Sequence, residues 1–96
     1  MYIRIVQFKL AKGSRAAAEE IANKVVPVIR AQPGCDRSEF FADDSTGDYG
    51  VFAIWATKAD AETAPAYVMP VLSQAMAEAQ STNNSRQLFE IIEPRA

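Results

Sequence analysis

Residues 49–57 read Tyr-Gly-Val-Phe-Ala-Ile-Trp-Ala-Thr, the most apolar stretch of the chain. The run is rich in aromatic and β-branched residues, which predicts a β-strand. Side chains alternate between the two faces of a strand, so the odd positions from Tyr49 to Trp55 share one face and Phe52 and Ile54 share the other. Because both faces are apolar, this strand is expected to be covered on both sides.

The chain on either side of this strand predicts a ferredoxin-like α+β fold with the element order βαββαβ. That order gives a four-stranded antiparallel sheet with both helices on one face, and a chain of 96 residues is long enough for one domain, 1–96. The expected strands are Tyr2–Leu10, Arg37–Ala42, Tyr49–Thr57 and Gln87–Glu93, with a polar loop at Ser81–Arg86 before the last one. The expected helical segments are Ser14–Ala31, a short turn at Lys58–Ala64, and Ala66–Gln80.

The face of the sheet away from the helices is also predicted to be apolar. Ile3 and Ile5 share one face of the first strand, and Phe89 and Ile91 share one face of the last, while the other face of each strand is also partly apolar. A second copy of the chain that lays its sheet over the first would cover whichever face the helices leave bare. The sequence therefore predicts a homodimer with an isologous sheet-to-sheet interface.

Composition argues against several classes of partner. The net charge is −2, and the 10 Lys and Arg residues are scattered, whereas nucleic-acid binding needs clustered cations. No apolar run approaches the roughly 20 residues of a membrane span, and the first residues lack a signal-peptide pattern. Cys35 is the single cysteine, so no internal disulfide can form and a reducing cytoplasm is the expected location.

The chain contains no histidine. Histidine is the commonest proton carrier near neutral pH and the commonest transition-metal ligand in proteins. With Cys35 as the only cysteine, one chain cannot assemble a structural zinc site or a histidine-ligated haem. The sequence therefore predicts a protein that works without a metal ion.

Three stretches together resemble the antibiotic biosynthesis monooxygenase (ABM) family. They are Ala31–Cys35, the aromatic run Glu39-Phe40-Phe41, and Gly50–Trp55 followed by an alanine-rich helical turn. The spacing of elements agrees along nearly the whole chain. The resemblance implies a dimeric α+β barrel, and it implies that Trp55 lines a pocket between the sheet and the helices. The superfamily ranges from cofactor-independent quinol and polyketide monooxygenases to haem-degrading enzymes and members without known activity.

Some positions depart from the family pattern. Ala53 stands where the family often has a glutamate, and Ala64 and Pro65 stand where it often has a histidine. Val6 stands where haem-degrading members carry an asparagine. These departures argue against the haem-degrading branch, and they leave quinol oxidation without the assisting histidine.

The candidate ligand-binding groups are an indole and two guanidinium ions. Trp55 offers a flat surface for a planar ligand and one N–H donor, although a core role is compatible with the same position. Arg4 or Arg86 could hold a phenolate or carboxylate, the alternative being an ion pair with Glu39 or Glu90. Those two glutamates are also candidate general bases if buried, or plain surface residues if exposed.

The remaining candidates are weaker. Tyr67 could donate a phenol hydrogen bond, or it could be a half-exposed residue at the start of a helix. Cys35 is a poor nucleophile candidate because no histidine can activate it. The apolar wall of the substrate site is expected from Val6, Phe8, Met69 and Leu72, with plain core filling as the alternative for Met69.

The leading functional hypothesis is a monooxygenase without cofactor that acts on a small aromatic phenol or quinol, or on a polyketide-like molecule. In this reading Trp55 stacks on the ring, Arg4 or Arg86 stabilises its anion, and Tyr67 hydrogen-bonds an oxygen. The alternative is a non-catalytic small-molecule-binding or stress-associated dimeric barrel. A third reading is a purely structural oligomer.

Overall fold

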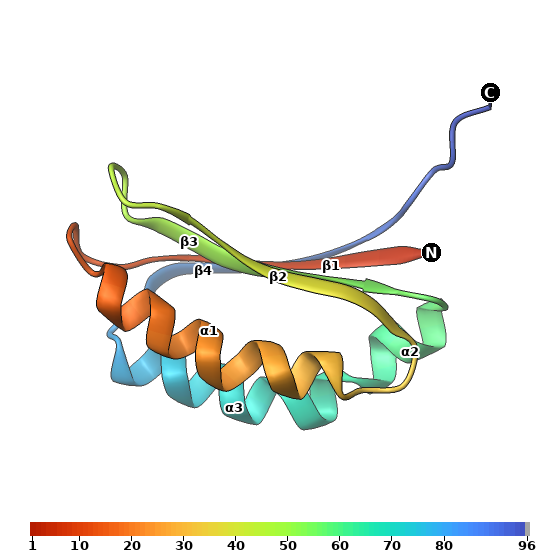
Figure 1. The fold of residues 1–96 in the computed structure, drawn as a ribbon, viewed down its shortest axis with the longest axis horizontal. Helices are drawn as coiled ribbons and strands as arrows, with labels where there is room; N and C mark the ends of the chain where they lie inside the picture. The colour runs from red at the N-terminus through yellow and green to blue at the C-terminus, as the bar shows by residue number, and fades with distance from the viewer. Residues whose placement is uncertain (96) are drawn as a thin grey trace.

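A single antiparallel sheet of four strands, with all the helices on one of its faces, forms the protein (Figure 1). The structure is a computed structural model and describes residues 1–95. The predicted order βαββαβ and the ferredoxin-like class are confirmed, with the strands ordered β2-β3-β1-β4 across the sheet. The elements are β1 (Tyr2–Lys9), α1 (Arg15–Arg30), β2 (Cys35–Asp43), β3 (Asp48–Trp55), α2 (Lys58–Thr63), α3 (Pro65–Glu78) and β4 (Thr82–Glu90).

The core lies between the sheet and the helices. On β3, Tyr49, Val51, Ala53 and Trp55 face the helices and are all buried, as their alternation predicts. On β1, Val6 and Phe8 are buried on the same side. Helices α1 and α3 cover these strands with apolar stripes, whose buried members are Ala18, Ile21, Val25, Val26, Ile29, Val68, Leu72, Ala75 and Met76.

The prediction for the last strand is wrong in its position. β4 begins at Thr82, inside the predicted polar loop, and ends at Glu90. Its backbone pairs with β1 from Tyr2↔Glu90 to Lys9↔Thr82. These hydrogen bonds join main-chain groups and do not depend on side-chain type, so the pairing with β1 sets where β4 begins and ends. Ile91 bonds only to Met1, N to O at 2.8 Å, because β1 has no residue left to pair with Ile92. An edge strand tolerates the polar sequence because its side chains are exposed.

The opposite face of the sheet carries no helix (Figure 1), and several of its side chains are apolar. Cross-strand pairs share a face, so the register assigns its side chains. We call this surface the open face; its apolar members are Ile3, Ile5, Phe41, Phe52, Ile54 and Phe89. Phe89 is 49% exposed. Patches of neighbouring apolar side chains on a surface commonly mark interaction sites.

The free edge of β2 is blocked by a side chain. The Nε and Nη2 atoms of Arg30 donate to the carbonyl oxygen of Ser38 at 3.2 and 2.9 Å. The same guanidinium lies 3.0 Å from the carboxylate of Glu39. Because an edge carbonyl is already bonded, this edge is a poor template for another strand.

Gly50 lies where β3 has no room for a side chain. A Cβ at this position would lie 2.5 Å from the carbonyl oxygen of Val6 and would also overlap the ring of Phe41. We expect Gly50→Ala to lower the free energy of unfolding by about 2 kcal/mol, because the backbone of a central strand must shift. Urea unfolding followed by circular dichroism measures this.

Gly13 provides the matched control for Gly50. It has open space around it and φ +80°, so Gly13→Ala should cost about 1 kcal/mol through backbone conformation alone, whereas Gly50, which lacks a positive φ, should lose stability through crowding alone. In the Gly50→Ala background, Phe41→Ala removes only the ring overlap and should restore stability in part. Full stability of Gly50→Ala alone would contradict the crowding argument.

Candidate ligand pocket

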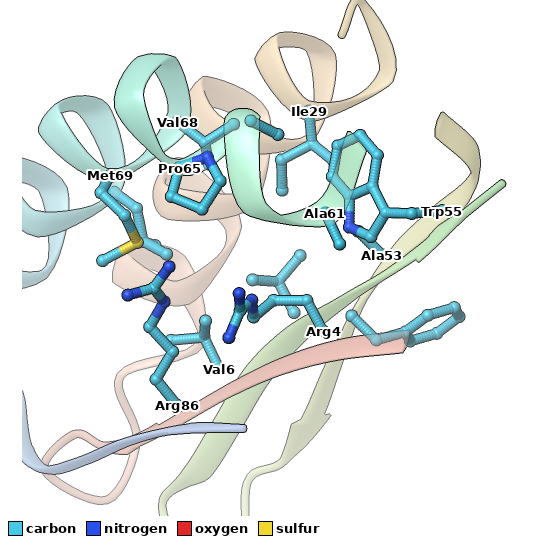
Figure 2. Close-up of a pocket in the computed structure, with 14 residues that line it drawn as sticks. Arg4, Val6, Ile29, Ala53, Trp55, Ala61, Pro65, Val68, Met69 and Arg86 are labelled. Carbon is cyan, nitrogen blue, oxygen red and sulfur yellow. The ribbon is translucent and has the colours of Figure 1, made fainter. Parts of the chain in front are cut away.

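A small cavity lies between the sheet and the helices at the end of β3 (Figure 2). Its floor comes from Arg4 and Val6 on β1 and from Ala53 and Trp55 on β3. Its roof comes from α2 and α3, chiefly Ala61, Ala64, Val68, Met69 and Leu72. We call this space the inner cavity. Its volume of about 30 Å³ suffices for about two water molecules.

Arg4 and Arg86 place two positive charges at the inner cavity. Arg86 on β4 pairs with Val6, two residues along β1 from Arg4, so the arginines are diagonal neighbours on the helix-facing side. Figure 2 shows both guanidinium groups above the sheet, with Met69 over Arg86. Burial lowers the pKa of Arg4, the nearby charge of Arg86 lowers it further, and Glu62 raises it in part. The site therefore favours an anion.

Two buried N–H donors in the inner cavity have no partner. Arg4 Nε and Trp55 Nε1 make no hydrogen bond within residues 1–95. Trp55 is only 3% exposed, so bulk water does not satisfy its N–H. A buried donor left unpaired costs about 1–3 kcal/mol, and native proteins carry few of them. Acceptor oxygens inside the inner cavity, supplied by a ligand or by the water molecules for which it has room, would satisfy these donors.

The ion-pair alternative for the two arginines is wrong. In the described part of the chain no carboxylate lies within 4.0 Å of Arg4 or Arg86, whereas Glu39 pairs with Arg30 and Arg37 instead. The register places Glu39 beside Phe52 on the open face, on the other side of the sheet from the inner cavity. Among the described residues, neither guanidinium group therefore has a carboxylate partner.

No acid or thiol lines the inner cavity. Glu90 is exposed, and neither it nor Glu39 contributes to the wall. Cys35 is half-buried outside the cavity, where burial and then the charge of Asp36 raise the pKa of its thiol. A raised pKa disfavours the reactive thiolate. Among residues 1–95 there is also no cluster of three His, Cys, Asp or Glu side chains that could hold a metal ion.

Two of the predicted site residues lie elsewhere. Tyr67 is 63% exposed and borders a different surface hollow, with Gln32 and Asp60. It precedes Val68, which faces the core, and neighbouring residues on a helix point about 100° apart. Phe8 is 2% exposed and packs in the core against Phe40, with ring centroids 6.1 Å apart. The other candidates, Arg4, Val6, Trp55, Met69, Leu72 and Arg86, all line the inner cavity.

The sequence analysis noted three small residues as departures from the family pattern but did not place them in the wall of the site. Ala53, Ala64 and Pro65 all line the inner cavity. These are the positions at which the ABM resemblance leads one to expect a glutamate and a histidine. The signal for them was the alanine-rich turn after Trp55, since small side chains opposite a large aromatic ring leave space. Their effect is an apolar wall on this part of the inner cavity.

The fold and the pocket define a ferredoxin-like α+β protein with a cavity between sheet and helices. The family model for antibiotic biosynthesis monooxygenase matches residues 1–64. The chain therefore belongs to the ABM family, which is part of the dimeric α+β barrel superfamily. In the described residues no helix is both long and apolar enough to cross a membrane. No curated protein matches the sequence.

Solved structures share this fold at low sequence identity. SnoaB from Streptomyces nogalater, a cofactor-independent oxygenase, is 20% identical with a TM-score of 0.76, over 97% of this chain and 94% of its own. Rv0793 from Mycobacterium tuberculosis is 12% identical with a TM-score of 0.74, over 99% of this chain and 98% of its own. NE2512 from Nitrosomonas europaea, a protein of unknown function, is 16% identical with a TM-score of 0.75, over 99% of this chain and 92% of its own. At these identities the likeness concerns the fold alone.

Proposed function

We propose that this protein is a monooxygenase that needs no cofactor and oxidises a small acidic aromatic molecule, a phenol, quinol or polyketide-like compound. The observation that carries the proposal is the pair of buried, unpaired donors, Arg4 Nε and Trp55 Nε1, in an otherwise apolar cavity. A cofactor-independent oxygenase of the same fold, SnoaB, supports it further. We also propose that residues 1–96 act as one domain.

The chemistry follows from the charges at the inner cavity. Arg4 and Arg86 stabilise the deprotonated ligand, which lowers the pKa of its phenol or of a neighbouring CH₂. Trp55 supplies a flat apolar surface and donates one hydrogen bond. Because no carboxylate lines the cavity, the proton leaves to water. The apolar roof of α2 and α3 then limits the access of water to the anion.

The anion is the reductant for dioxygen. An anthrone-type CH₂ loses one proton, the carbanion transfers an electron to O₂, and a carbon–oxygen bond forms. The resulting hydroperoxide loses water and leaves a carbonyl group, so that CH₂ + O₂ gives C=O + H₂O. The substrate supplies all four electrons, and one oxygen atom enters the product.

Oxygen uptake with 1,8-dihydroxyanthrone tests the proposal. We expect the protein to raise the rate above the uncatalysed oxidation, with one O₂ consumed per anthraquinone formed and no hydrogen peroxide released. Trp55→Phe keeps the aromatic surface but removes the donor, and it should lower the catalysed rate about tenfold. Uptake no faster than in buffer alone would overturn the proposal.

A binding function without catalysis is the second candidate, and the absence of an acid–base group from the inner cavity favours it. The two functions separate in one experiment. Tight binding of the anion 1-hydroxy-2-naphthoate, seen as quenching of Trp55 emission, together with no oxygen uptake, would support the binding protein. Trp55 is the only tryptophan, so its emission reports on the cavity alone.

We further propose that two copies pair through the open face. The apolar side chains of Ile3, Ile5, Phe52 and Ile54 support this, and membership of a dimeric superfamily agrees with it. The bonded edge of β2 favours pairing through the face rather than through this edge. Besides a second copy of the chain, the proposed binding partner is a small aromatic molecule. The cytoplasmic location expected from the lone Cys35 stays a prediction.

A further inference from the structure

A second hollow lies beside the inner cavity, where α3 turns into β4. Its volume is about 360 Å³, against about 30 Å³ for the inner cavity. We call it the outer hollow. Val6, Met69 and Arg86 line both spaces. These three side chains therefore form the wall between the inner cavity and the outer hollow.

The inner cavity must enlarge before it can hold an aromatic ring. A cavity that takes benzene measures about 150 Å³. Trp55, Leu72 and Ala61 are at most 3% exposed and are held by the packed core, so they are poorly placed to move. Met69 is half-buried and Arg86 is exposed, and both have long unbranched side chains. The wall that can give way is thus the one toward the outer hollow.

The chemistry of the outer hollow differs from that of the inner cavity. Its polar side chains are Ser73, Ser81, Asn84 and Ser85, which are all neutral, and Arg86 is its only charge. None of these four makes a side-chain hydrogen bond to another described residue. Hydroxyl and amide groups both donate and accept, which suits alcohols, ethers and carbonyl groups.

We propose that the outer hollow is the second half of the ligand site and takes a neutral, oxygen-bearing substituent of the ligand. The inference rests on the proposed anion site in the inner cavity. The ring occupies the enlarged inner cavity against Trp55, and the substituent extends past Met69 toward Ser73 and Asn84. Met69 lines both spaces and lies over Arg86 (Figure 2), and it swings aside when a ligand binds.

The position of the arginines narrows the ligand class. Arg4 lines only the inner cavity, whereas Arg86 borders both spaces. The acidic oxygen must therefore lie within the ligand, between its ring and its substituent, rather than at either end. An ortho-acyl phenol and an aryl β-dicarbonyl in its enol form have this arrangement, and each presents two oxygens to a pair of guanidinium groups.

Three naphthamides test the proposal through the emission of Trp55. The parent, 1-hydroxy-2-naphthamide, reports on the inner cavity. Its N-(2-hydroxyethyl) and N-propyl derivatives have tails of similar size that differ in one hydroxyl group. We expect the hydroxyethyl compound to bind three- to tenfold more tightly than the propyl compound, as one or two added hydrogen bonds allow. The double variant Ser73→Ala/Asn84→Ala should bring this ratio close to one.

The controls separate this inference from the proposed function. Asn23→Ala, on the exposed face of α1, should keep the wild-type ratio. Met69→Ala should speed association of both tailed compounds severalfold, because it opens the wall. If the hydroxyethyl and propyl compounds bind the wild-type protein equally well, or if the double variant keeps the wild-type ratio of their affinities, the outer site is overturned. Binding of the parent compound would still uphold the inner site. Failure of the parent to bind would overturn the proposed function as well.

Discussion

Arg4→Met is expected to stabilise the fold and to weaken binding of 1-hydroxy-2-naphthoate about 100-fold. In the ligand-free protein the charge of Arg4 is partly buried, lies beside Arg86, and leaves its Nε without a partner. Replacing an unpaired, partly buried charge by an apolar side chain of similar length gains about 1 kcal/mol of stability. The same change removes a charge-assisted contact to the ligand, which accounts for the lost affinity.

Opposite signs for stability and affinity are the signature of a residue kept for function. Urea unfolding gives the stability, and quenching of Trp55 emission gives the affinity. Lys12→Met removes the same charge from an exposed loop and should change neither quantity. A less stable Arg4→Met protein would mean that the guanidinium has a structural partner. Unchanged affinity would mean that the anion is held elsewhere.

Ile5→Lys is expected to convert the proposed dimer into monomers, raising the dissociation constant by at least about 100-fold. Ile5 lies on a central strand between Phe52 and Gln87, near the middle of the open face. Because an isologous interface presents the same surface twice, one substitution buries two unpaired ammonium groups. Each would be removed from water into an interface whose centre, around Ile5 and Phe52, is apolar. Sedimentation velocity at micromolar concentrations measures the change.

Asn23→Lys is the matched control for Ile5→Lys. It adds the same charge on the exposed face of α1, away from the open face, and should leave sedimentation unchanged. Circular dichroism would show whether the Ile5→Lys chain remains folded. A wild-type protein that sediments as a monomer, or a folded Ile5→Lys protein that still sediments as a dimer, would contradict pairing through the open face.

Alternation of side chains predicted the two central strands well. It separated Val6 from Ile5 and Trp55 from Phe52 onto opposite faces of their strands, and the register agrees. It succeeded because both faces of these strands are apolar and a slip of one residue would exchange them. For β4 the apolar pattern predicted the wrong bounds. Hydrogen bonds to β1 fix where this strand begins and ends, and most of its side chains are exposed.

The candidate site was predictable only in part. Trp55 followed from the family resemblance, and Arg4 was singled out as a charged residue that shares a strand face with apolar ones. Tyr67 did not, since a shift of one residue on a helix turns a side chain from the core to solvent. That Glu39 pairs with Arg30 and Arg37 rather than with Arg4 also depends on which face each residue occupies.

The sequence by itself determined the element order, the apolar central strand and the absence of histidine, because these depend on local pattern and composition. Only the tertiary structure decided what surrounds residues 49–57. It places Trp55 beside small alanines, leaves its N–H and Arg4 Nε without partners, and sets Met69 and Arg86 between two hollows. These features arise from side chains far apart in sequence, whose contacts are fixed by packing and register rather than by local propensity.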